Sequence, residues 1–117
     1  MAIVGIGVDV VDLSRFAASL ERTPTLRDRL FTAAEVDLPL ESLAGRFAAK
    51  EAFVKACRAP AGMSWQDIEI VADTVGAPVM TLTGAALDRA TELGITTTHV
   101  SISHDTIVAT AFVVAEC

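Results

Sequence analysis

The segment 40–58 constrains the fold of this chain more than any other. It is rich in Leu, Ala, Phe and Val, contains no proline, and is interrupted by a single glycine, Gly45. At 100° per residue, its apolar side chains cover most of the circumference of a helix. A helix of this kind is buried on most of its surface, so we expect the rest of the chain to pack around it.

The charged side chains of this helix fall into two groups. Glu51, Lys55 and Arg58 lie within one sector of about 60°, and Arg46 and Lys50 share a second sector. Charges on a buried helix need partners. Glu51 and Lys55 have the i,i+4 spacing of a helical ion pair, which contributes only a few tenths of a kcal/mol when exposed. Taken alone, such a pair is more often structural than functional.

Length and composition limit the class of protein. The chain has 117 residues, of which 52% are hydrophobic, and this suits a single domain over residues 1–117. Its net charge of −6 argues against nucleic-acid binding, which favours a basic domain. No apolar run reaches the length of a membrane span, and the N-terminus shows no export signal. Cys57 and Cys117 lack metal-ligand spacing, so we expect a reduced protein in the cytoplasm.

The cations of this acidic chain are concentrated in two places. Residues 46–58 carry four cations and one anion, a local balance of +3, and residues 15–29 contain four arginines. Such clusters are either solvated faces or surfaces that bind anionic partners.

Residues 3–11 alternate as a strand and place a carboxylate on the same face as two glycines. The even-numbered positions are aliphatic and face one side, whereas Gly5, Gly7 and Asp9 face the other. Glycine inside a strand marks close approach of a ligand or of another backbone, so we expect open space beside Asp9. The alternative is a strand-edge carboxylate paired with an arginine. The two glycines lack the third glycine of a dinucleotide-binding fingerprint, because Val10 stands in its place.

The rest of the chain predicts short helices and antiparallel strands. Thr32 and Glu35 form a capping-box pattern, so we expect Glu35 to be structural. Segments 99–104 and 107–114 form a predicted hairpin with a central returning strand, and His104 lies beside its Asp105-Thr106 turn. A lone strand-end histidine is more often structural than functional. The other predicted elements are a helix capped by Asp12 or Ser14 and ending near Glu21, a helical turn at 26–30, a helix-ending segment at 59–62, strands at 66–72 and 79–82, and a helix at 84–93 capped by Thr83.

This order of elements favours an α+β domain, in which a largely antiparallel sheet packs against helices. Two carboxylates, Asp9 and Glu51, and the clustered cations then suggest one shared site. Mg²⁺ is usually held by one or two carboxylates together with substrate phosphates and water, and nearby Lys and Arg suit phosphate charge. The residues alone therefore predict a Mg²⁺-dependent site that acts on a phosphate or diphosphate compound.

Four motifs, in order and spread over residues 3–115, resemble one family. They are Gly5-Ile6-Gly7-Val8-Asp9, then Arg46-Phe47-Ala48-Ala49-Lys50-Glu51-Ala52 with Lys55-Ala56, then Asp67-Ile68-Glu69-Ile70, and Ser101-Ile102-Ser103-His104. The set is similar to that of the holo-acyl-carrier-protein synthases, the small 4′-phosphopantetheinyl transferases. The resemblance implies their α+β fold and a Mg²⁺-dependent transfer of phosphopantetheine from CoA to a serine of apo acyl carrier protein, with release of adenosine 3′,5′-bisphosphate.

The same resemblance implies a role for individual residues. Asp9 and Glu51 would be the metal ligands, and Lys55 would lie against the CoA diphosphate and neutralise or protonate the leaving group. His104 would lie near the CoA 3′-phosphate, with a general-base role toward the serine as the alternative. The remaining implied contacts are Arg46 and Lys50 with the CoA phosphates, Ser103, Gly76 and Pro78 in the nucleotide pocket, and Arg15, Arg22, Leu26 and Arg29 on the surface that grips the carrier protein.

The family resemblance also implies a homotrimer with CoA sites between subunits. The acceptor is either a free carrier protein or a carrier domain of a fatty acid synthase. The chain departs from the family in its glycine-poor loop at 58–62 and in a short link before Arg46. Two other functions compete: a non-catalytic trimeric binding module of the same fold, and a small nucleotide hydrolase. The second lacks any G-x-x-x-x-G-K-[ST] phosphate loop.

Overall fold

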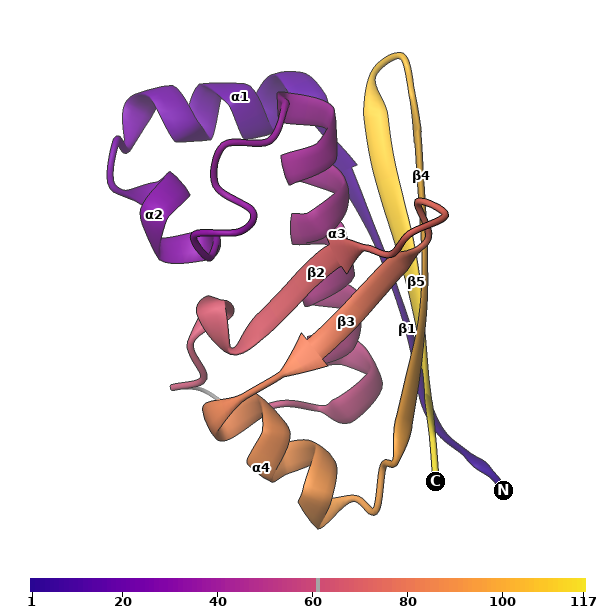
Figure 1. Cartoon of the computed structure of the whole chain (residues 1–117). Helices are drawn as coiled ribbons and strands as arrows, with labels where there is room; N and C mark the ends of the chain where they lie inside the picture. Colours follow the sequence, from indigo (N-terminus) through magenta and orange to yellow (C-terminus); the bar gives the residue numbers. More distant parts are fainter. Residues whose placement is uncertain (61) are drawn as a thin grey trace.

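A computed structural model describes residues 1–60 and 62–117 of the chain; Ala61, in the predicted helix-ending segment, lies outside the described residues. The elements, in chain order, are β1 (Ile3–Asp12), α1 (Leu13–Arg22), α2 (Leu26–Leu30), α3 (Leu40–Cys57), the 3-10 turn η1 (Trp65–Asp67), β2 (Ile68–Ala72), β3 (Pro78–Leu82), α4 (Gly84–Glu92), β4 (Thr97–Asp105) and β5 (Val108–Glu116). Figure 1 shows α3 at the centre, with β1, β4 and β5 on one side, the β2–β3 hairpin crossing in front of it, and α1 and α2 at one end. The predicted α+β architecture is confirmed.

The strands form two antiparallel sheets. The larger has the order β1-β5-β4, and the smaller pairs β2 with β3. The predicted returning strand, β5, is indeed central. The final hairpin is longer than predicted, because Asp105 pairs with Val108 and the turn falls one residue later, at Thr106 and Ile107. Thr106 adopts a positive φ of 36° there.

Helix α3 lies across the inner face of the larger sheet (Figure 1), and small side chains allow the close contact. Alternate residues of β5 are buried alanines and Val113. On β1, Gly5 and Gly7 face the helix: a Cβ at Gly5 would stand 1.9 Å from the carbonyl oxygen of Ala56, and one at Gly7 would stand 1.8 Å from that of Ala52. The glycines thus mark the approach of another backbone. The space at the two glycines is filled by α3, whereas Asp9, farther along the strand, borders open space as predicted.

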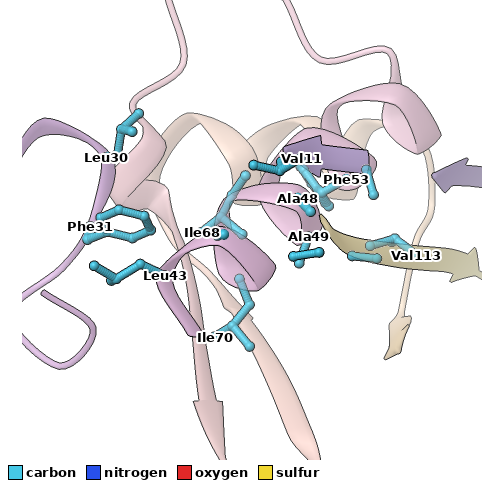
Figure 2. Packing of buried hydrophobic residues seen from close by; sticks show 14 of the residues in the cluster. Val11, Leu30, Phe31, Leu43, Ala48, Ala49, Phe53, Ile68, Ile70 and Val113 are labelled. Atoms are coloured by element: carbon cyan, nitrogen blue, oxygen red, sulfur yellow. The ribbon is translucent and has the colours of Figure 1, made fainter. Parts of the chain in front are cut away.

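The core lies between α3, the larger sheet and the β2–β3 hairpin. Figure 2 shows Leu43, Ala48, Ala49 and Phe53 of α3 among the buried side chains of this cluster, which also include Ile70 of β2. All five are fully buried. Truncating a large buried side chain of this kind to alanine lowers the free energy of unfolding by about 2–5 kcal/mol. The buried face of α3, predicted from the apolar circumference of residues 40–58, therefore stabilises the fold strongly.

Two predicted helix caps have different outcomes. The Asp12 carboxylate accepts a hydrogen bond from the backbone N–H of Arg15 at 2.9 Å, so Asp12 caps α1 as predicted. Thr83 precedes α4 but makes no side-chain capping bond. The Asp67 carboxylate, which is distant in sequence, accepts from the Ala85 N–H at 3.2 Å in its place. Thr83 thus occupies the predicted N-cap position, but its side chain does not supply the capping bond.

Candidate active site

An open groove of about 480 Å³ lies where β1 meets the first turns of α1 and one side of α3. Asp9 reaches it from the end of β1, and Glu51 and Lys55 reach it from successive turns of α3. The chain turns from β1 directly into α1, so Arg15 and Phe16 form the opposite wall. The two carboxylates predicted as metal ligands, 42 positions apart in the sequence, thus line one groove.

Asp9 is held at the groove by an ion pair with a residue of α3. Lys55 Nζ lies 2.9 Å from Asp9 Oδ1 and also donates to the Val8 carbonyl oxygen at 3.0 Å. The Lys55 side chain is 53% exposed and that of Asp9 is 18% exposed, so this pair stands at the border between protein and solvent. Lys55 therefore forms its ion pair with Asp9 of β1. The i,i+4 spacing had suggested an ion pair with Glu51 along α3 instead.

The surroundings of Glu51 in the groove change its titration. Partial burial and the nearby negative charge of Asp9 raise the pKa of Glu51, and the ammonium of Lys55 acts against that rise. A second negative group close to Glu51 thus makes its ionised form unfavourable. A divalent cation between two such carboxylates would remove this repulsion, so the donor set fits a hard cation with oxygen ligands.

The described residues, 1–60 and 62–117, contain no group of three or more His, Cys, Asp and Glu side chains placed to hold a metal ion. A site of two carboxylates completed by substrate oxygens and water agrees with this finding. Cys57 does not belong to such a site, because burial raises the pKa of its thiol to about 11 and keeps it protonated.

A second, smaller pocket of about 190 Å³ brings together four other predicted residues: Arg46, Gly76, Pro78 and His104. Glu41 and Ser42 of α3 complete it on one side; sequence reasoning missed both, although Ser42 stands one helical turn before Arg46. Among the described residues, none lines both this pocket and the groove. His104 is therefore separated from Asp9 and Glu51 within one chain.

Arg46 is fixed in this second pocket by backbone acceptors. Its Nε–H donates to the Ile70 carbonyl oxygen at 2.9 Å, and its terminal nitrogen Nη1 donates to the Ser42 carbonyl oxygen at 3.4 Å. Partial burial lowers the pKa of the Arg46 guanidinium, and the charge of Glu35 acts against this change. Ser103 lies on the other face of β4 from His104 and does not line the pocket.

Lys50 does not lie where a CoA phosphate contact would require it. Its side chain and that of Glu35 are both 0% exposed, and their Nζ–Oε1 distance is 2.7 Å. Burial lowers the pKa of Lys50, against the influence of Glu35. The predicted phosphate contact is therefore wrong for this residue, because the ammonium is enclosed by protein acceptors. The structural role predicted for Glu35 is confirmed, since its carboxylate also accepts from the Thr32 N–H at 3.0 Å.

The residues predicted to contact the carrier protein lie on α1 and α2. Arg15, Arg22 and Arg29 are exposed, and Leu26 is half-buried against the core. Arg15 also lines the groove, so the basic surface is continuous with the two carboxylates. Three aromatic rings contact one another in series: Phe16 stacks on Phe47, and Phe47 meets Trp65 edge-on. Sequence reasoning missed this row of rings.

Comparison with known proteins identifies the family of this chain. The sequence model of the 4′-phosphopantetheinyl transferase superfamily matches residues 5–111. The chain belongs to this superfamily. It is 58% identical to the holo-acyl-carrier-protein synthase of Leifsonia xyli over 97% of each chain, and 60% identical to that of Micrococcus luteus over 97% of this chain and 92% of the relative.

Solved structures of the superfamily share the fold over nearly the whole chain. The holo-acyl-carrier-protein synthase of Neisseria meningitidis superposes with a TM-score of 0.86 at 33% identity, covering 99% of this chain and 100% of the other. The enzyme of Helicobacter pylori, solved in complex with coenzyme A, has a TM-score of 0.83 at 32% identity, covering 95% and 99%. The phosphopantetheinyl transferase fold recognised from the four sequence motifs is thus confirmed.

Proposed function

We infer that this chain is a holo-acyl-carrier-protein synthase, which transfers 4′-phosphopantetheine from CoA to a serine of apo acyl carrier protein. The observation that carries this inference is the placement of Asp9, Glu51 and Lys55 in one groove that is open to solvent and bordered by Arg15. The relatives named above carry this activity in their names and match the chain from end to end.

Asp9 and Glu51 are the residues that would hold Mg²⁺. When bound, the ion supplies charge stabilisation for the diphosphate of CoA. The transfer joins the serine oxygen to the phosphorus that carries pantetheine and breaks the bond from that phosphorus to adenosine 3′,5′-bisphosphate. Catalysis of this kind consists mostly of positioning and of charge stabilisation.

Lys55 is a cation of the groove that can stabilise the negative charge of the leaving group. Its ammonium already lies at the rim, half exposed, and donates to Asp9 and to the Val8 carbonyl oxygen. An anionic diphosphate beside Asp9 would give this flexible side chain a third partner. Lys55 thereby opposes the negative charge that grows on the departing adenosine bisphosphate.

We further propose that the active form is a homotrimer and that each CoA is bound between two chains. The outer face of the larger sheet carries exposed apolar side chains on β1 and β5: Val4, Ile6, Val8, Val10 and Phe112. Ile6 is 58% exposed and Phe112 is 51% exposed, and contiguous exposed apolar residues of this kind mark interaction surfaces. Because the groove and the Arg46–His104 pocket share no residue, one CoA can use the groove of one chain and the pocket of its neighbour.

The carrier protein is proposed to bind on α1 and α2. Its acidic character would match the exposed arginines Arg15, Arg22 and Arg29, and Leu26 would add an apolar contact. Arg15 at the groove then places the acceptor serine beside the carboxylates. Within the described residues no helix combines the length and apolar character needed to span a bilayer. The cytoplasmic location stays a prediction.

A mass-shift assay tests the proposed function. The protein is incubated with CoA, Mg²⁺ and apo carrier protein, and the carrier is weighed by mass spectrometry. The expected result is a gain of about 340 Da, the mass of phosphopantetheine joined through a phosphodiester. Offering both a free carrier protein and a synthase-embedded carrier domain identifies the acceptor. No gain with either acceptor would contradict the proposal and would favour a non-catalytic module of the same fold.

A further inference from the structure

Lys50 binds three acceptors that come from three different segments. Its ammonium donates to the Leu30 carbonyl oxygen at 2.7 Å, to Glu35 Oε1 at 2.7 Å and to the Trp65 carbonyl oxygen at 3.2 Å. Leu30 ends α2, Glu35 lies in the following turn, and Trp65 begins η1. A single buried side chain of α3 thus holds the segment that carries the basic surface.

Glu35 extends the same network to the smaller sheet. Besides Lys50, its carboxylate accepts from the Thr32 N–H at 3.0 Å and, through Oε2, from the Ile70 N–H at 2.9 Å. Ile70 is fully buried in β2, and Figure 2 shows it in the cluster that also includes Leu30 and Phe31. Every polar atom of the buried pair therefore has a partner.

Ile70 passes this link on to Arg46. Its N–H donates to Glu35, and its carbonyl oxygen accepts from Arg46 Nε at 2.9 Å. Arg46 is one of the residues of the second pocket. The position of its guanidinium is thus set by a strand residue that is itself held by the buried pair.

Stability does not explain why the core contains this ion pair. Taking two charges out of water costs several kcal/mol per ion, and an apolar pair of similar size is often equally stable or more stable. What an apolar pair cannot do is hold three backbone segments at set positions through directed hydrogen bonds. The network joins the two surfaces that, under the proposed function, meet the two substrates.

We propose that Lys50 and Glu35 form a positioning pair that sets α2 for the carrier protein and Arg46 for CoA. The proposal rests on the proposed function, because it assigns the two surfaces to those substrates. One arm runs from Lys50 to the end of α2, and the other runs from Glu35 through Ile70 to Arg46. Neither Lys50 nor Glu35 touches a substrate.

The first test is the double variant Lys50→Met with Glu35→Gln, which removes both charges and keeps similar volumes. We expect it to fold, because paired removal avoids a lone buried charge. The KM values for CoA and for the carrier protein should each rise roughly tenfold, with kcat within about twofold of wild type, since binding surfaces move while the groove does not. Val113→Ala, a cavity variant in the buried centre of β5, is the matched control and should leave both KM values unchanged.

The outcomes separate positioning from simple loss of structure. Unchanged KM values in a folded double variant, or equal rises in Val113→Ala, would overturn the positioning role. A purely structural defect lowers the active fraction and therefore kcat, without raising KM. A wild-type chain that transfers nothing would overturn the proposed function, and the roles assigned to the two surfaces with it.

A second measurement needs no activity, and its first part uses the wild-type protein alone. In wild type, NMR should show slow solvent exchange of the Arg46 Nε–H, compared with that of the exposed Arg29, because its hydrogen bond to Ile70 is held by the network. In the double variant this exchange should quicken by roughly tenfold or more. Exchange at Arg46 as fast as at Arg29 in wild type would overturn the link between the pair and the second pocket.

Discussion

Gly7→Ala tests how closely strand β1 and helix α3 must approach to form the site. A Cβ at this position would stand 1.8 Å from the carbonyl oxygen of Ala52 and 2.7 Å from its carbonyl carbon, whereas ordinary contact begins at 3.4 Å. The shortfall to the oxygen is therefore about 1.6 Å. Both partners are backbone, so no side-chain rotation relieves the clash, and the strand and helix must separate.

The cost of that separation follows from its size. Overpacking a core costs typically 1–3 kcal/mol, and we expect at least about 3 kcal/mol here because neither partner has a rotamer to change. For a chain of this length, that loss lowers the melting temperature by roughly 12 °C. Gly7 stands two residues before Asp9, and Ala52 follows Glu51, so the same movement pulls the two carboxylates apart. A misplacement of about 1 Å can cost roughly a hundredfold in rate.

The assay pairs thermal unfolding with the mass-shift measurement. Gly94→Ala is the control, because Gly94 also needs conformational freedom, with a φ of 73°, but a Cβ added to it would meet no atom within 4 Å. That variant should lose only about 1–2 kcal/mol through backbone strain and should keep its activity. A Gly7→Ala protein as stable and active as Gly94→Ala would refute the close-approach explanation.

Three further predictions concern the groove and the two proposed binding surfaces. Glu51→Gln should raise the urea midpoint at pH 7, because burial and Asp9 raise the pKa of Glu51 above its ordinary value of 4.5 and its ionised form opposes folding. The gain should shrink as pH falls through that raised pKa, where wild-type Glu51 becomes protonated; a gain that persists in acid would contradict this cause. Arg29→Glu should raise KM for the carrier protein roughly tenfold without changing KM for CoA, and equal effects on both would contradict a separate carrier surface. Phe112→Asp should convert the proposed trimer to monomers in sedimentation and abolish transfer, whereas Leu87→Asp on α4, also exposed, should change neither; an active Phe112→Asp monomer would exclude a site shared between chains.

Local pattern predicted most of the fold. The apolar circumference of α3, the alternation of β1 and the hairpin of β4 and β5 follow from helix and strand periodicity, which needs no knowledge of distant contacts. Boundaries moved by one or two residues where the hairpin ladder extended through Asp105 and Val108. The N-cap position of α4 was predicted correctly, but the carboxylate that accepts from its first turn was not, because Asp67 lies 18 positions before the N–H that it binds.

The residues alone suggested Asp9 and Glu51 as one shared site, and the family motifs supplied the roles of the other site residues. Periodicity placed Lys50 in the same helical sector as Arg46, but it could not reveal Glu35, which lies 15 positions earlier and draws Lys50 into the core. The same limit hid the pairing of Asp9 with Lys55, 46 positions apart. In both cases a contact between distant segments decides which charged side chain is available to a substrate.

The central claim is that Asp9 and Glu51 together hold one divalent cation, and direct metal binding tests it most simply. Mn²⁺, a hard cation suited to carboxylate ligands, is titrated into the protein with CoA present and followed by electron paramagnetic resonance. We expect one bound Mn²⁺ per chain in wild type and loss of that binding in both Asp9→Asn and Glu51→Gln, with Asp88→Asn on the exposed side of α4 as an unchanged control. Wild-type stoichiometry and affinity in either groove variant would contradict it.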